Sequence, residues 1–147
     1  MIKRRNSLSV TQVIVIAMMI GGVAIILSRF LSASDGVETV DVNVPPQLSS
    51  LARSGKVLFD ANCAECHGEV GGGTDRGPPL VHDIYNPGHH ADVSFLLAAQ
   101  NGVRAHHWPF GNMPPQAQMN EAQVEAIVKY VRELQQANGI TYRPHRM

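Results

Sequence analysis

The sequence is poor in cysteine and in aromatic residues, and it carries no net charge. Of its 147 residues 2 are cysteines, so a four-ligand zinc site would have no second cysteine pair. Aromatic residues make up 5% and are not interleaved with a basic patch, which excludes the usual pattern of a nucleic-acid-binding surface. The chain also lacks a strand-rich region and an internal repeat. Its length leaves room for one small domain with appendages.

Basic and acidic residues are unevenly distributed along the chain. Four basic residues flank an N-terminal apolar stretch: Lys3, Arg4, Arg5 and Arg29. After Arg29 the chain has 8 Lys and Arg against 12 Asp and Glu, a net charge of −4. This mild acidic excess weakly favours protein partners that present a basic patch.

The N-terminal apolar stretch is long enough to span a membrane. Residues 13–27 form an unbroken apolar run of 15, and tolerating a few polar residues extends it to 24. A transmembrane helix needs about 20 mostly apolar residues. We therefore expect a basic cytoplasmic stub at 1–9 and a single transmembrane anchor at 10–31. Because basic residues that precede a membrane helix stay inside, the rest of the chain should lie on the periplasmic side of the cytoplasmic membrane.

A cleaved signal peptide is the alternative to a retained anchor. The apolar run is at the upper end of signal-peptide length, and Ser32, Ala33 and Ser34 offer a small-residue cleavage site. Arg29 lies between the run and that site and argues against cleavage. The sequence favours the retained anchor, and both alternatives export the remaining chain.

Residues 32–49 have the composition of a linker. They contain Ser, Asp, Gly and the pair Pro45-Pro46, with little apolar surface to bury. Residues 39–44 alternate like a short strand that has no partner, so we expect extended chain lying on the following domain. A flexible linker of this length would span roughly 20–25 Å and keep the domain near the membrane.

The chain is organised around Cys63-Ala64-Glu65-Cys66-His67. Two cysteines separated by two residues and followed by a histidine are the attachment pattern of haem c. Each thiol adds to one vinyl group of the haem, and the histidine offers an imidazole nitrogen to the iron. Half of a zinc site and a thioredoxin-like redox pair are the alternatives. No other cysteine supports the first alternative, and no strand before Cys63 supports the second.

Three short helices are expected after the linker, at about 50–62, 93–101 and 121–137. Their predicted caps, in chain order, are Ser49 or Ser50, then Asp92, then Asn120. Gly55, inside the first helix, indicates that another element approaches closely. An apolar stripe at helical spacing predicts the core face of the third helix: Val124, Ile127, Val128, Val131 and Leu134. So few elements make a small core, to which a haem would add an apolar centre.

Four stretches, in this order and spacing, carry a family resemblance: Gly55-Lys56-Val57-Leu58-Phe59 with residues 62–68, then Gly77-Pro78-Pro79-Leu80, Gly111-Asn112-Met113-Pro114-Pro115 and Ala126-Ile127-Val128-Lys129-Tyr130-Val131. Over about residues 50–138 the chain resembles a class I c-type cytochrome. The resemblance implies an all-α cytochrome c fold of three to five short helices around one covalently attached haem c. The haem domain would occupy 50–139, followed by a C-terminal tail at 140–147.

The resemblance also implies roles for individual residues. Pro78 would accept a hydrogen bond from the second imidazole nitrogen of His67, Leu80 would wall the haem, and the first and last helices would cross at Gly55 and Tyr130. The implied haem ligands and pocket residues are covalent Cys63 and Cys66, axial His67 and Met113, and pocket-lining Pro78 and Leu80.

Met113 is favoured by its own surroundings as well. It lies in a loop bracketed by glycine and proline, 110–115, and such a loop is stiff enough to aim one side chain. Met119 precedes a helix cap, and Met147 is the last residue given. A histidine ligand or an open iron position is the alternative. Histidine plus methionine ligation would fill both axial sites and raise the reduction potential.

Six other histidines lie in or near loops, and four of them form adjacent pairs: His82, His89, His90, His106, His107 and His145. The pairs raise a copper or zinc hypothesis, although adjacent histidines support it less than i,i+4 spacing does. Otherwise some histidines would line the haem crevice with Trp108 and Phe110, and others would be solvated. The candidate contacts for a haem propionate are Arg76, Arg104, and His106 or His107.

Three functions are compatible with these features. The first is a membrane-tethered mono-haem carrier that shuttles single electrons between redox complexes and has no small-molecule substrate of its own. The second is a haem c subunit of a larger dehydrogenase or terminal oxidase. The third, a haem sensor or enzyme with an open iron site, conflicts with Met113. The tether favours the first function, in which the attachment loop and the Met113 loop would border the haem edge where partners dock.

Overall fold

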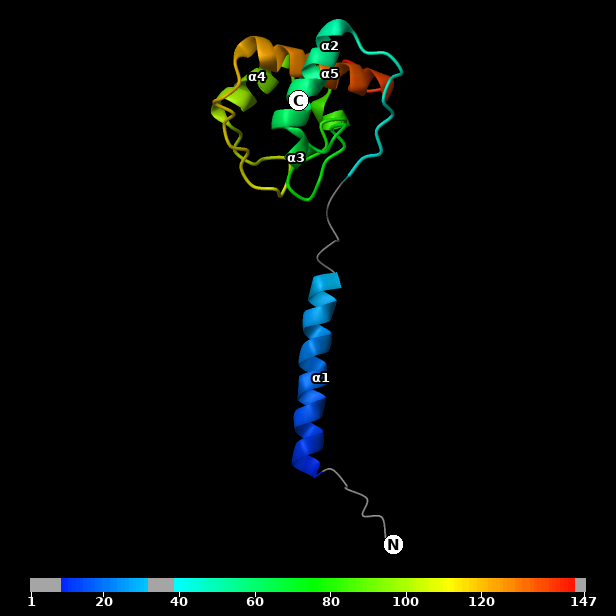
Figure 1. Ribbon diagram of the computed structural model, residues 1–147, viewed down its shortest axis with the longest axis vertical. Helices are drawn as coiled ribbons and strands as arrows, with labels where there is room; N and C mark the ends of the chain where they lie inside the picture. Colours follow the sequence, from blue (N-terminus) through cyan, green and yellow to red (C-terminus); the bar gives the residue numbers. More distant parts are fainter. Residues whose placement is uncertain (1–8, 32–38, 145–147) are drawn as a thin grey trace. The chain divides into compact units, whose positions relative to one another are not determined.

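The computed structural model describes residues 9–31 and 39–144, and the chain divides into two units, Met1–Gly36 and Val37–Met147. The described helices are α1 (Val10–Leu31), α2 (Ser50–Asn62), α3 (Ala64–His67), the 3-10 helix η2 (Asp83–Tyr85), α4 (Asp92–Asn101) and α5 (Glu121–Ala137) (Figure 1). In these ranges no strand forms, and the single β pairing is an isolated bridge between Val103 and Met113. The all-α prediction is confirmed.

Helix α1 coincides with the predicted membrane anchor. It has 22 residues and is therefore about 33 Å long, close to the thickness of the hydrocarbon core of a bilayer. None of its most apolar stretch, Val10–Ser28, is buried, and this stretch is long and apolar enough to cross a membrane. Residues 1–8, with the basic cluster, and residues 32–34, the candidate cleavage site, lie outside the described residues.

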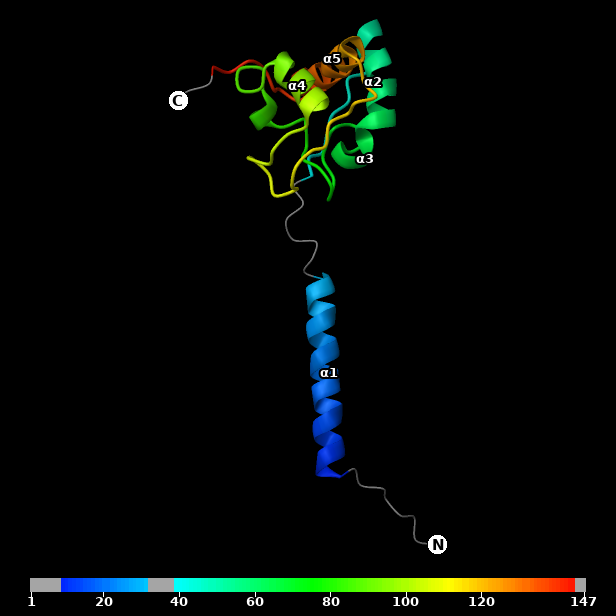
Figure 2. The ribbon, with the colours of Figure 1, turned by 90° about the vertical axis from the view of Figure 1, so that its left-hand side faces the viewer.

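Helices α2 and α5 cross in direct contact and form the centre of the second unit (Figures 1 and 2). At the crossing a Cβ on Gly55 would lie 1.8 Å from the carbonyl oxygen of Ala126, so only glycine fits there. Next to it the rings of Phe59 and Tyr130 meet edge to face, 5.4 Å apart between centroids. The crossing that the resemblance implied is therefore present.

The ends of these two helices are set by local hydrogen bonds. The hydroxyl of Ser49 accepts from the backbone N–H of Ala52 at the start of α2. Asn120 and Gln123 form a reciprocal capping box at the start of α5. The predicted cap of α4 is wrong, because Ala91 holds the cap position and Asp92 is the first helical residue.

Residues 39–48 form neither helix nor strand and lie along the rest of the second unit. The backbone N–H of Val40 donates to the carbonyl of Gly72 at 2.7 Å, and Asn43 exchanges hydrogen bonds with Asn138. Val42 and Leu48 pack against the hydrophobic core. The part of the predicted linker that the structure describes is thus attached to the domain.

At the other end of the domain Ile140, at the start of the predicted tail, is buried in the core. The predicted boundaries themselves stay a prediction.

Replacing Gly55 with alanine should destabilise the domain. Alanine favours a helix by about 1 kcal/mol over glycine, yet its methyl group would overlap the Ala126 carbonyl and force α2 away from α5. We expect the clash to win, with a net loss of about 2 kcal/mol or more in the free energy of unfolding. Urea unfolding of the haem-loaded protein measures the loss.

Ser54→Ala is the matched control for this change. Ser54 is the preceding residue on α2 and is exposed, so its substitution should change stability by less than about 0.5 kcal/mol. Equal stability of the Gly55→Ala and Ser54→Ala proteins would contradict the close crossing.

Candidate functional site

The two cysteines lie at the junction between α2 and α3. Cys63 is the residue that ends α2 and caps α3, and its N–H donates to the Phe59 carbonyl at 2.8 Å. Cys66 lies three residues further on, so both side chains are on one face of a single helical turn. Both are partly buried free thiols, and burial raises the pKa of Cys63 to about 11. The two thiols form no disulfide, and their spacing lets both of them bond to a single prosthetic group.

His67 is oriented by a backbone carbonyl. Its Nδ1 lies 2.9 Å from the carbonyl oxygen of Pro78 and donates to it, which leaves the lone pair on Nε2. Burial lowers the pKa of His67, and the hydrogen bond to Pro78 offsets part of that effect. The imidazole is therefore neutral at neutral pH, which is the form that binds a metal.

The loop between α3 and η2 is folded tightly against the cysteine turn. A Cβ on Gly77 would lie 2.8 Å from the Cys66 carbonyl oxygen, so the loop passes directly over α3. Leu80 is partly buried and packs against the core, and its N–H donates to the Gly71 carbonyl at 2.8 Å. These contacts bring Pro78 and Leu80 to the turn that carries the thiols.

Met113 lies on a loop whose backbone is pinned. Its N–H and carbonyl both pair with Val103 at 3.0 Å, and its side chain is partly buried. Gly102 has a φ of +73°, and a Cβ there would lie 2.5 Å from the Met113 carbonyl oxygen. The loop is thus held to the end of α4, which fixes the backbone from which the methionine projects.

Other predicted haem contacts have different partners. Arg76 is ion-paired with Glu65, and both side chains are more than half exposed. Arg104 is exposed. The indole N–H of Trp108 donates to the Tyr85 hydroxyl at 3.1 Å. The propionate assignments therefore stay predictions.

Four histidines gather outside this turn. His89 and His90 face His106 and His107 across two loops, with ring centroids between 4.2 and 6.3 Å apart. Burial lowers the pKa of His90, and burial with the neighbouring histidines lowers the pKa of His107. The sequence shows that each pair is adjacent in the chain, but it did not predict that the two pairs would lie close together in the fold.

Arg132 was missed by the sequence analysis. Its guanidinium is buried and donates to Asp92 at 2.7 Å, to the carbonyls of Tyr85 and His90, and to Gln135. The side-chain amide of Gln135 donates in turn to the carbonyls of Leu80 and Tyr85. Arg132 and Gln135 each lie four residues after an apolar residue of the α5 stripe, and that spacing is the signal that could have found them.

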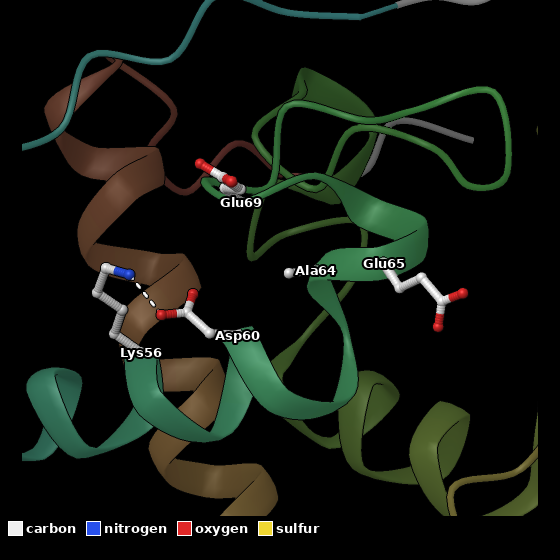
Figure 3. A pocket seen from close by; sticks show the side chains of 5 residues that line it. All are labelled: Lys56, Asp60, Ala64, Glu65 and Glu69. Atoms are coloured by element: carbon white, nitrogen blue, oxygen red, sulfur yellow. Dashed lines mark hydrogen bonds and ion pairs between the residues drawn. The ribbon is translucent and has the colours of Figure 1, made fainter.

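A surface pocket of about 650 Å³ lies beside α2 and α3 (Figure 3). Five residues line it: Lys56, Asp60, Ala64, Glu65 and Glu69. Lys56 and Asp60 form an ion pair at 2.6 Å within it, and Glu65 points away. None of the predicted haem ligands lines this pocket, so we assign it no role in haem binding.

The fold and the site together define a class of protein. An all-α domain presents two unpaired thiols on one helical turn, next to a neutral histidine whose free nitrogen is set by a carbonyl. This donor set fits haem c, since two thioethers and one axial imidazole are what the group requires. The class is that of c-type cytochromes.

Comparison with known proteins agrees. The family model described as cytochrome c matches residues 52–135, more than half of the chain, so the chain belongs to the cytochrome c family. Membership of this family implies a covalently attached haem c, and Cys63 and Cys66 have the spacing of its attachment motif. Among the described helices, α1 is long and apolar enough to cross a membrane.

Two curated relatives share the same printed description, Cbb3-type cytochrome c oxidase subunit FixP. The chain is 52% identical over 44 residues to the protein of Azorhizobium caulinodans, a match that covers 29% of the chain and 15% of the relative. It is 36% identical over 78 residues to the protein of Bradyrhizobium diazoefficiens, covering 52% of the chain and 27% of the relative. The chain thus spans about a quarter or less of the length of these relatives.

Replacing Arg132 with methionine should loosen the segment that leads from Leu80 to His90. The carbonyls of Tyr85 and His90 would lose a buried donor, and we expect a loss of about 2–3 kcal/mol in the free energy of unfolding. Denaturant unfolding of the haem-loaded protein provides the measurement.

Lys129→Met, on the same helix, is the control. Lys129 is partly exposed and pairs with Glu133, which also accepts from the backbone N–H of Ser49 and so keeps a partner when Lys129 is lost. The loss of Lys129 should therefore cost less than about 1 kcal/mol. A similar effect of both substitutions would show that the buried network contributes no more than a surface pair does.

Proposed function

We propose that this protein is a membrane-tethered electron carrier that passes single electrons between redox complexes and catalyses no bond-making reaction of its own. The observation that carries the proposal is the 2.9 Å hydrogen bond between His67 and the Pro78 carbonyl. It gives the imidazole one tautomer and one orientation, and it raises the basicity of the other nitrogen. A fixed, neutral ligand is what a redox centre needs if it is to change charge without rearranging.

Each residue of the site has a proposed task. Cys63 and Cys66 hold the haem through thioethers, and the bound haem iron supplies one-electron redox chemistry. His67 and Met113 would both ligate the haem iron. Pro78 orients His67, and Leu80 excludes water from the same side. With both residues bound to the iron, the site would transfer electrons and would leave no iron position open to a small molecule.

We propose that partners dock where the cysteine turn and the Met113 loop come to the surface. Glu65 is exposed on that turn, and the part of the chain after Arg29 has a net charge of −4. A partner with a basic patch suits this surface.

The anchor is proposed to be retained, with the N-terminus in the cytoplasm and the haem domain on the periplasmic side. The exposed apolar helix α1 and the basic residues 3–5 support this orientation. An oxidase subunit is the second candidate function, and the similarity to FixP of two bacteria is the observation that favours it.

Replacing Met113 with leucine should remove the weak near-red absorption band that methionine sulfur gives on ferric haem iron. Leucine keeps the volume of the side chain but has no sulfur to donate. We also expect the reduction potential to fall, because methionine ligation raises it. The absorption spectrum and a redox titration of the purified protein measure both effects.

Met119→Leu is the matched control, because Met119 packs against the core and should leave the band unchanged. If the unmodified protein has no such band and binds carbon monoxide at neutral pH, the iron site is open. The carrier assignment would then be wrong.

Solubilisation in mild detergent separates the two candidate functions. A freely tethered carrier should purify alone, with one haem per chain, and should donate electrons to an added oxidase with a salt-dependent rate. Stoichiometric co-purification with a cbb3-type oxidase would instead establish a fixed subunit.

A further inference from the structure

Three histidines from two separate loops converge at the surface of the haem domain. His89 and His90 lie between η2 and α4, and His107 lies between α4 and the Met113 loop. One ligand nitrogen from each of the three lies within 4.8 Å of the others. His89 and His107 are exposed and His90 is partly buried, so an ion in solution can reach all three.

The spacing of two of these nitrogens matches tetrahedral coordination. Zn–N bonds are about 2.0–2.1 Å, which places two tetrahedral nitrogen ligands roughly 3.3–3.4 Å apart. The Nε2 atoms of His89 and His107 are 3.4 Å apart and share a hydrogen bond, whose proton a metal ion would replace. Neighbouring ligands of an octahedral or square-planar ion would lie closer together, at roughly 3 Å for the same bond length.

His90 has the hydrogen bond that a metal-binding histidine usually makes. Its Nδ1 donates to the Ile84 carbonyl at 2.8 Å, so the lone pair is on Nε2. Histidine ligands of metals almost always donate their other N–H to a carbonyl or carboxylate in this way, which fixes ring and tautomer. The same arrangement orients His67 in the haem site.

The backbone that carries these histidines is held independently of any ion. Arg132 donates to the His90 carbonyl, and the N–H groups of His89 and His90 donate to the Asn86 carbonyl. On the other loop the Asn112 side chain accepts from the Ala105 N–H at 3.0 Å. The two loops are thus positioned before binding, which reduces the ordering that binding requires.

We propose that His89, His90 and His107 form a binding site for one divalent transition-metal ion, with Zn²⁺ as the ion that the spacing of His89 and His107 fits. Three imidazoles without carboxylate or thiolate suit zinc and copper and do not suit magnesium or calcium. A water molecule would fill the fourth position. The ion would join the loop before α4 to the loop that ends in Met113, and so restrain the segment carrying the proposed axial ligand.

Zinc binding to the haem-loaded full chain tests the site. The ferric protein in detergent is stripped with a chelator and titrated with Zn²⁺ alone, by calorimetry and by metal analysis after gel filtration. We expect one zinc per chain, and an affinity at least about tenfold lower in His107→Asn and in His89→Asn, because the loss of a group behind a ligand already costs that much.

His82→Asn is the control variant. His82 is outside the three-histidine group, and asparagine can replace it as the acceptor for the Ile84 N–H. An unchanged haem spectrum in each variant shows that the fold is intact. No stoichiometric zinc in the unmodified protein, or equal affinity in the His107→Asn and His82→Asn proteins, would overturn the proposal.

Discussion

The crossing of α2 over α5 is the contact on which the remaining structure depends. At Gly55 the two backbones touch, because a carbonyl of α5 occupies the space that any Cβ would need. Phe59 and Tyr130 fill the adjacent layer and are fully buried, and burial of the Phe59 side chain contributes about 1.5–3 kcal/mol. The cysteine turn follows α2 directly, and Cys63 is bonded back to Phe59, so the position of the haem attachment site is set by this crossing.

Helix α5 has a second task besides completing the core. Its apolar stripe packs on α2, while Arg132 and Gln135 reach from its edge to backbone carbonyls between Leu80 and His90. Irregular chain leaves many carbonyls without partners, and a buried guanidinium with several donors satisfies them together. One helix thus orders the loop that contains Leu80 and the loop that carries two of the clustered histidines.

The domain contains two sites in which a histidine has the same hydrogen-bonding arrangement. In each, a histidine Nδ1 donates to a backbone carbonyl, Pro78 for His67 and Ile84 for His90, and the other nitrogen is left to bind. The first site stands beside two thiols and the second beside two further imidazoles, so they suit different ligands. A metal ion bound by the second site would restrain the loop that carries Met113.

The sequence by itself determined the attachment motif, the three main helices and the membrane helix, since each depends on residues close together in the chain. It also led to the Gly55 crossing, because a mid-helix glycine needs a reason and the family resemblance supplied one. It did not determine the Arg132 network or the meeting of the two histidine pairs, and it placed the α4 cap one residue too late. The bonds from Arg132 to Tyr85, His90 and Asp92, and the contacts between the two histidine pairs, join residues more than 15 positions apart, and only tertiary packing brings them together. The cap of α4 is a local feature that the sequence analysis misplaced by one residue. Local spacing predicts which face a side chain is on, whereas its partner across the fold is a property of tertiary structure.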